Sequence, residues 1–195
     1  KNWNQLILLT NKAYNNKIIN LETSNKNISI AYYEISKIKK YSEPKEANKL
    51  IQKAIKLNFF FPPFIKTHLE ILLNLENSAQ LRKTIKRYWK NSPNSSLRSV
   101  ISDFCKENKL DDLESIESIT SSNKQEIESK KLLLEFAIIN ANWSLARENV
   151  SGLINNNPDR EICKFMALLE LGENNDKQKS DAWYLRAENA KLDNI

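Results

Sequence analysis

Residues that break helices are scarce in this sequence, and their scarcity limits the fold. The 195 residues include only 2 glycines and 5 prolines. A β-rich fold of this length would need many more turn residues between its strands. Hydrophobic residues make up 41% of the chain and aromatic residues 9%, which is enough for a sizeable core. The composition therefore predicts a folded, all-α protein.

Cysteine and histidine are also rare, which leaves little for metal binding or catalysis. Cys105 and Cys163 lie 58 positions apart, and neither belongs to a CxxC motif. Two unlinked cysteines favour a reducing compartment. His68 is the only histidine, and its setting in "FIKTHLEILL" is typical of a packing or surface residue.

The motifs of the common enzyme classes are absent too. The sequence contains no GxSxG, no P-loop, no GxGxxG and no HExxH. One acidic cluster consists of Asp111, Asp112, Glu114 and Glu117. Carboxylates at the start of a helix interact favourably with the helix dipole and need no metal to explain them. We therefore predict a non-enzyme with no catalytic residue, no metal and no resident cofactor.

Long apolar runs are missing as well. No run approaches the roughly eighteen residues of a membrane span, and the N-terminus lacks the basic and apolar layout of a signal peptide. The chain opens with "KNW", which is typical of the middle of a turn, and it stops at "LDNI" just after a helical pattern. We expect a soluble fragment of a longer protein.

What is present is an internal repeat, first visible in residues 140–158, "NANWSLARENVSGLINNNP". Ala146 stands twelve residues before Pro158, where a tetratricopeptide repeat places a small residue because two helices cross closely. Similar residues recur in steps of 34, 32, 33 and 34 at Ala47, Leu81, Leu113, Ala146 and Ser180. Seven positions after each of these come Ala54, Tyr88, Thr120, Leu153 and Ala187. Steps near 34 are the tetratricopeptide period.

This period predicts the architecture. We expect an all-α fold of tetratricopeptide-like helical hairpin repeats, stacked in a right-handed superhelix as a single domain over residues 1–195. Residues 1–20 hold the second helix of a truncated repeat, from Trp3 to Asn16. The successive repeats cover residues 28–61, 62–93, 94–126, 127–158 and 159–195. The third repeat is degenerate, and its Ser-rich second half, "SIESITSSN", predicts a short or frayed second helix.

Aromatic residues near the turns are interpreted as packing residues. Trp143 stands three positions before Ala146, and regularly spaced aromatic residues usually belong to a core. The stretch "NFFFPPFI", residues 58–65, is either an exposed docking patch or an apolar clamp between two repeats. We favour the clamp, because Pro63 suits the first turn of a helix.

A family resemblance is carried by the segment "DREICKFMALLELGENNDKQKSDAWYLRAENAKLD". It resembles the last repeat of the HemY proteins in their alphaproteobacterial form, where an Arg-x-Cys-x-x-Met-Ala-x-Leu-Glu helix precedes a small acidic turn and an Ala-rich helix with a Trp. The matching residues are Arg160, Cys163, Met166, Ala167, Leu169, Glu170, Asp176, Trp183 and Ala187. The segments "PPFIKTHLEILLNLENSAQLRKTIKRYWKNSPNSSL" and "KNWNQLILLTNKAYNNKII" are similar to two further parts of the family, in the same order. The chain departs from the family in its third repeat and in replacing many Ala and Gly residues with Asn, Lys and Ser.

The resemblance implies a place in the cell and a set of partners. It implies a bacterial inner-membrane protein with two spans upstream of Lys1 and with this soluble domain on the cytoplasmic face. Members of the family are linked to the late steps of haem biosynthesis as scaffolds or regulators. Late haem-biosynthesis enzymes are therefore the protein partners that the resemblance implies. Direct haem or porphyrin binding is the alternative, with Cys163 and Met166 one helical turn apart, although both residue types are common in cores.

Charge is distributed unequally along the chain. Residues 1–93 contain 17 Lys and Arg against 6 Asp and Glu, whereas residues 94–195 contain 13 against 18. The segment "LRKTIKRYWKNSP" concentrates Arg82, Lys83, Lys86, Arg87 and Lys90. A solvated helix face is the interpretation we favour for this segment, and contact with an anionic membrane surface or with nucleic acid are the alternatives. Of these two, nucleic acid is disfavoured.

Repeat proteins usually bind along the surface lined by the first helix of each repeat. The positions expected to face this groove are Tyr32, Ser36, Lys39, Lys40, Lys66, Glu70, Asn74, Arg98, Ser102, Lys106, Lys131 and Glu135. This set is basic towards its N-terminal end, so an acidic partner segment or the carboxylates of a tetrapyrrole would complement it.

Two functional hypotheses follow from the sequence. The first is a membrane-associated interaction scaffold linked to haem biosynthesis, which binds partner proteins or tetrapyrrole through the basic groove. The second is a generic tetratricopeptide adaptor for another membrane or envelope complex, with no role in tetrapyrrole chemistry.

Overall fold

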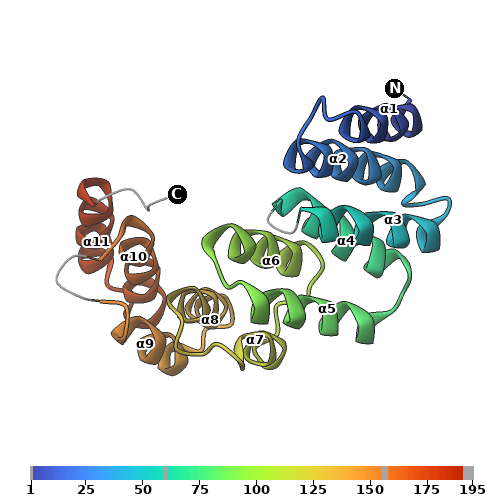
Figure 1. Ribbon diagram of the computed structural model, residues 1–195. Helices are drawn as coiled ribbons and strands as arrows, with labels where there is room; N and C mark the ends of the chain where they lie inside the picture. Colours follow the sequence, from blue (N-terminus) through green and yellow to red (C-terminus); the bar gives the residue numbers. More distant parts are fainter. Residues whose placement is uncertain (1, 59–60, 155–157, 191–195) are drawn as a thin grey trace. The chain divides into compact units, whose positions relative to one another are not determined.

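The computed structural model describes residues 2–58, 61–154 and 158–190, and within these residues it contains eleven α-helices and no strand (Figure 1). The all-α prediction is confirmed. The helices are α1 (Trp3–Asn15), α2 (Leu21–Lys39), α3 (Pro44–Leu57), α4 (Pro62–Asn74), α5 (Ser78–Asn91), α6 (Ser95–Glu107), α7 (Leu113–Thr120), α8 (Ile127–Ile139), α9 (Trp143–Ser151), α10 (Arg160–Asn174) and α11 (Lys177–Asn189).

Most helices begin at an asparagine or aspartate that caps the first turn. The side chain of this residue accepts a hydrogen bond from the backbone N–H three positions later, which satisfies one of the donors left free at a helix start. The capping residues are Asn2, Asn20, Asn94, Asp112, Asn142, Asp159 and Asp176. The abundance of asparagine in this sequence therefore has a structural use.

The turns after α4, α6, α8 and α10 repeat one backbone conformation. Each contains a residue with a left-handed φ, at Glu76 (54°), Lys109 (55°), Ala141 (52°) and Asn175 (51°). None of the four is glycine, the residue that adopts this conformation most easily. The steps between them, 33, 32 and 34 residues, follow the period of the sequence.

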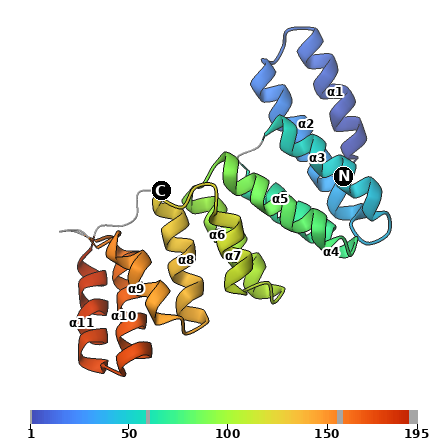
Figure 2. The same cartoon turned by 90° about the horizontal axis from the view of Figure 1, so that it is seen from below.

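The chain divides into two compact units, unit 1 (Lys1–Thr84) and unit 2 (Ile85–Ile195), and the division falls within α5. In unit 1, α1 packs on α2, α2 on α3, and α3 on α4. In unit 2, α7 and α9 pack on α8, and α10 packs on α8, α9 and α11 (Figure 1, Figure 2). Trp89 of α5 donates its indole N–H to the Ser129 hydroxyl of α8 at 2.9 Å, inside unit 2.

The recurring small and apolar residues lie in the cores of these units. Ala146 is fully buried in a cluster with Leu134, Val150 and Met166. The other recurring residues are buried as well, except Leu113, which is half-buried. Trp143 packs on Gly172 of α10, so its prediction as a packing residue is confirmed. The residues that recur in the 34-residue pattern therefore form contacts between helices.

The structure differs from the sequence expectation at two helices and supports it at a third. α2 begins at Leu21, seven residues before the expected start of the first repeat at residue 28, because Asn20 caps the helix there. α1 ends at Asn15, one residue before the expected end. The short second helix of the third repeat is α7, with eight residues. The repeat boundaries and the right-handed superhelix remain predictions.

The phenylalanine stretch is described only from Phe61 onwards, because Phe59 and Phe60 lie outside the described residues. α4 begins with Pro62 and Pro63, as the preference of proline for a first helical turn predicts. The Phe64 ring is buried, 4.9 Å from the Tyr33 ring of α2 and 4.7 Å from the Phe61 ring. Phe64 of α4 therefore packs on α2. Phe61, the described member of the three phenylalanines expected to form the clamp, is 41% exposed, and the clamp remains a prediction.

Candidate interaction surfaces

Charged side chains of α6, α8 and α10 meet on one surface of unit 2. We call this surface the charged row. Its members are Arg98, Ser102 and Lys106 of α6, Glu128, Lys131 and Glu135 of α8, and Asp159 and Glu161 at the start of α10. Five of the eight are predicted groove residues.

Arg98 is the centre of the charged row. Its Nε lies 2.7 Å from Glu128 Oε2, one terminal nitrogen lies 2.5 Å from Glu161 Oε1, and the other lies 3.7 Å from Glu135 Oε2. Only 9% of its side chain is exposed. Because a guanidinium offers five donors in a fixed plane, one arginine can join three helices in this way.

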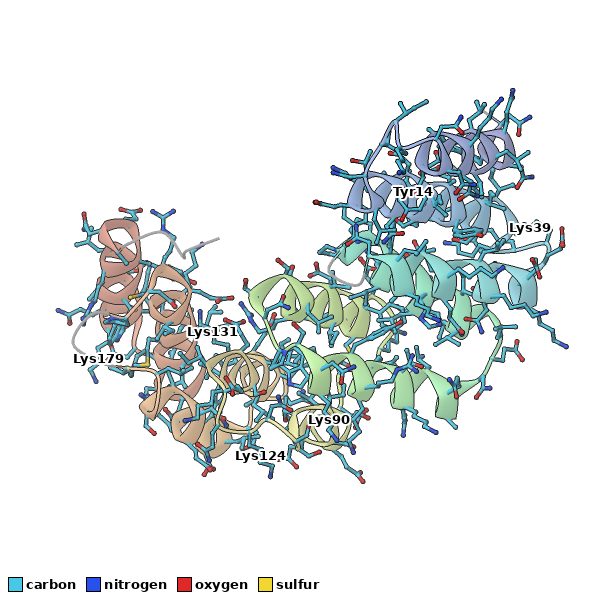
Figure 3. The ribbon with its side chains drawn as sticks, viewed as in Figure 1. Tyr14, Lys39, Lys90, Lys124, Lys131 and Lys179 are labelled. Atoms are coloured by element: carbon cyan, nitrogen blue, oxygen red, sulfur yellow. The ribbon has the colours of Figure 1, made fainter. Side chains whose placement is uncertain are left out.

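Lys131 of α8, labelled in Figure 3, is paired in a similar way. Its Nζ lies 2.8 Å from Asp159 Oδ2 and 3.0 Å from Glu161 Oε2, and 5% of its side chain is exposed. On the α6 side, Lys106 Nζ and the Ser102 hydroxyl both donate to Glu135 Oε1. Glu135 and Glu161 are each shared by two cations, so the row is one continuous network.

Burial and ion pairing shift the pKa of the two buried cations, Arg98 and Lys131, in opposite directions. Burial alone would lower the pKa of Arg98, but the carboxylates of Glu161 and Glu128 outweigh it and raise the pKa. Burial likewise opposes the charge of Lys131, and its hydrogen bonds to Asp159 and Glu161 raise its pKa. Both side chains therefore remain charged at neutral pH, held by their partners.

The pairing changes the character of the predicted groove in unit 2. The row combines three cations with four carboxylates, so it carries no excess of positive charge. Lys106 is the most exposed cation of the row, with 42% of its side chain accessible. An acidic ligand would have to compete with carboxylates already in contact with the cations, and this counts against the basic groove expected from the sequence.

Three of the predicted groove residues of unit 1 form ion pairs. Lys40, the C-cap of α2, lies 2.8 Å from Glu70 of α4, and Lys39 lies 2.9 Å from Glu43, in the turn before α3. Burial opposes the charge of Lys40, but the hydrogen bond to Glu70 is among the contacts that raise its pKa. The remaining positions are Tyr32 and Lys66, both half-buried, Ser36, which is buried and donates to the Tyr33 carbonyl, and Asn74, which is exposed.

Exposed cations with no carboxylate partner among the described residues are concentrated on α3 and α5. The five basic residues of α5 are exposed, and Lys86 Nζ donates to the Ser118 hydroxyl at 3.0 Å. On α3, Lys45, Lys49, Lys53 and Lys56 are exposed. Sequence reasoning missed the α3 set. The signal that would have found it is the spacing of its lysines by three or four residues, opposite the apolar residues of the same helix.

The residues considered for chemistry lie in the cores. His68, Cys163 and Met166 are buried, and the Cys163 thiol points to the Pro158 carbonyl. Burial raises the pKa of Cys163 and raises that of Cys105 to about 12. Among the described residues, no group of three or more His, Cys, Asp or Glu side chains is arranged to hold a metal ion.

The acidic cluster around α7 has the local use expected of it. Asp112 is the N-cap of α7 and accepts a hydrogen bond from the Ser115 N–H at 2.8 Å. Glu114 lies in the first turn of the same helix, where its charge interacts favourably with the helix dipole.

None of the helices in the described part of the chain combines the length and the apolar character that a membrane crossing requires.

Comparisons with known proteins do not assign the chain to a family. No family model matches it, and no curated protein matches it. A solved structure described as "MamA RS-1 ArsTM double mutant" is similar to this chain with a TM-score of 0.45 and 12% sequence identity, over 83% of this chain and 93% of that one.

Proposed function

We propose that this protein is a non-catalytic interaction scaffold, and that it binds partner proteins through the charged row. One observation carries the proposal: predicted groove positions from two successive first helices, α6 and α8, meet on one surface with residues of α10. Surfaces shared by consecutive repeats are the usual binding surfaces of repeat proteins.

The geometry of the row supports a partner that carries both signs of charge. Its buried ion pairs hold their donors and acceptors in fixed positions, which reduces the entropy lost on binding. Lys106 remains accessible, and Asp159 and Glu161 are also partly exposed. Hydrogen-bond acceptors and donors on the partner can therefore bind these accessible side chains while the buried ion pairs stay intact.

Capture of partners from an extract of the native cells tests this proposal. We expect Lys106→Ala to reduce the captured partner at least fivefold, because truncation of one of the few residues that dominate an interface costs more than about 1 kcal/mol. Lys164→Ala is the matched control, since Lys164 is an exposed lysine of α10 outside the row. Equal capture by the wild type, Lys106→Ala and Lys164→Ala would exclude the row as the binding surface.

The resemblance to HemY supports a finer version of the proposal. In this version the partners are late enzymes of haem biosynthesis, and the full-length protein places the scaffold beside the inner membrane. Binding of tetrapyrrole carboxylates through Lys39, Lys40, Lys66, Arg98 and Lys106 belongs to the same version. Four of these cations are already paired with carboxylates of the chain, and the carboxylates of a free tetrapyrrole would have to compete with them. Partner proteins are therefore better candidates than free tetrapyrrole.

Capture from native membranes distinguishes this version from a generic adaptor. Recovery of haem-pathway enzymes above all other proteins supports the link to haem, whereas recovery of another membrane or envelope complex supports the generic adaptor. Turnover of a porphyrinogen by the purified protein would overturn the non-enzyme proposal.

A further inference from the structure

A face of α3 is strongly basic and is separate from the charged row. α3 spans Pro44–Leu57 in unit 1 and buries its apolar residues against α2 and α4. Its opposite side exposes Lys45, Lys49, Lys53 and Lys56. We call these four residues the lysine face.

The four lysines share a narrow strip of the helix surface. At about 100° per residue they lie within roughly 80° of the helix circumference, and from Lys45 to Lys56 they extend over about 16 Å. The only acidic residue of α3, Glu46, is half-buried at the edge of this strip. The lysine face is therefore a continuous line of positive charge.

The lysine face also lacks the pairing seen in the charged row. Across the described residues, none of its four ammonium groups has a carboxylate within ion-pairing distance. Lys53 Nζ lies 5.4 Å from the centre of the Tyr32 ring, a contact that leaves its charge uncompensated. Like charges at this spacing repel one another, and this repulsion would be reduced if a negatively charged group bound beside them.

The chemistry of the face selects among anionic occupants. It presents only lysine, a flexible point charge, without the planar fork of arginine that recognises a particular carboxylate or phosphate geometry. α3 contains no aromatic residue on which a nucleic-acid base could stack. A single exposed helix side suits a broad anionic surface that needs no defined orientation, and four or more basic residues on an amphipathic helix are typical of proteins that contact anionic lipids.

We propose that the lysine face of α3 binds the anionic headgroups of a phospholipid bilayer. The four ammonium groups lie against the headgroup phosphates and displace their counterions, and the apolar side of α3 stays in the core of unit 1. The helix therefore rests on the membrane surface and does not insert. This inference is independent of the proposed function, which concerns the charged row.

The repeat period places a second set of cations at equivalent positions. Lys49, Lys53 and Lys56 correspond, 34 residues later, to Lys83, Arg87 and Lys90 of α5. These three are exposed too, and the Arg87 guanidinium lies over the Tyr88 ring at 5.5 Å, much as Lys53 lies over the Tyr32 ring. The α5 positions therefore provide a second set of substitutions against which the lysine face can be compared.

Vesicle sedimentation tests the proposal with the purified chain. We expect binding to phosphatidylcholine vesicles that contain about 30 mol% phosphatidylglycerol, no binding to pure phosphatidylcholine, and loss of binding at about 1 M salt. The combined variant Lys49→Glu, Lys53→Glu and Lys56→Glu should bind at least a hundredfold more weakly, because each lysine contributes about fivefold. Circular dichroism melting verifies that the variant is folded.

The matched control makes the same change of net charge elsewhere. It combines Lys124→Glu, Lys164→Glu and Lys177→Glu, three exposed lysines of unit 2 that do not belong to the lysine face, and we expect less than a threefold loss of vesicle binding. An equal loss in both variants would overturn the proposal. So would loss only in the variant Lys83→Glu, Arg87→Glu and Lys90→Glu. Binding to duplex DNA by the lysine face, without binding to anionic vesicles, would also overturn it.

Discussion

The charged row and the lysine face contain the same kinds of residue in opposite surroundings. In the row, Arg98 and Lys131 are buried and each contacts at least two carboxylates. On α3, the lysines are exposed, and within the described part of the chain none of them has a carboxylate partner. Positive charge therefore stabilises contacts between helices in one region and remains available to a ligand in the other.

The comparison shows that a count of basic residues along the chain does not locate a basic surface. Both regions contain several cations, and the sequence alone assigned those of α6 and α8 to a groove for acidic ligands. What separates the regions is the distance from each cation to a carboxylate on a neighbouring helix.

The largest expected effect tests the row directly. Arg98→Ala leaves Glu128, Glu135 and Glu161 with one cation fewer among them, and we expect it to lower the free energy of unfolding by about 3–5 kcal/mol. Lys53→Ala on the lysine face should change it by no more than about 0.5 kcal/mol. Urea unfolding of both variants measures the contrast. Similar costs for the two would remove the distinction between the regions.

A pair of glycines extends the comparison to uncharged positions. A Cβ added at Gly172 would lie 2.5 Å from the Trp143 ring, so we expect Gly172→Ala to destabilise the protein by about 1–3 kcal/mol. A Cβ at Gly152 meets only the flexible end of Lys130 at 3.1 Å, and Gly152→Ala should be neutral or slightly stabilising. Thermal melting of the two variants measures the difference, and an unchanged melting temperature for Gly172→Ala would contradict the packing of Trp143.

Coupling between the two buried cations sharpens the comparison further. Arg98 and Lys131 share Glu161, so a double-mutant cycle with Arg98→Ala and Lys131→Ala should give an interaction energy of about 0.5–3 kcal/mol. The corresponding cycle with Lys49→Ala and Lys53→Ala should be additive within about 0.5 kcal/mol. Additivity in both cycles would show that the row is not a connected network.

The smallest expected effect concerns an ion pair of intermediate exposure. A hydrogen bond from Arg147 lowers the pKa of Glu170, so the carboxylate contributes stability above its unfolded pKa. This contribution is lost as the pH falls through the lower, folded pKa. Because Arg147 is about one third exposed, we expect Glu170→Gln to cost about 1 kcal/mol or less at pH 7.

Urea unfolding of the wild type and Glu170→Gln at a series of pH values measures this effect. The difference between the two proteins should shrink as the pH falls from about 5 towards 3. A difference that does not depend on pH would show that packing, and not the charge of Glu170, is responsible for it.

Local patterns were sufficient for much of the fold. The shortage of glycine and proline predicted helices, and the recurrence of Ala47, Ala146 and their counterparts predicted positions that the structure buries, with Leu113 half-buried. The start of α2 was predicted wrongly. The start at residue 28 followed from the repeat period, which contains no information on capping, whereas Asn20 caps the helix so that it begins at Leu21.

The candidate sites were less accessible to sequence reasoning. The period placed Arg98, Ser102, Lys106, Lys131 and Glu135 on a common surface, and the structure brings these five together. Their partners Glu128, Asp159 and Glu161 were not among the predicted positions. The lysine face was overlooked because its residues were counted only in the net charge of residues 1–93.

The sequence by itself determined which segments are helical, where most helices begin, and which residues face the core, because capping and periodicity act over a few neighbouring positions. Only the tertiary structure decided which charges are paired. Arg98 meets carboxylates 30, 37 and 63 residues later in the chain, and an electrostatic interaction depends on distance and burial in space.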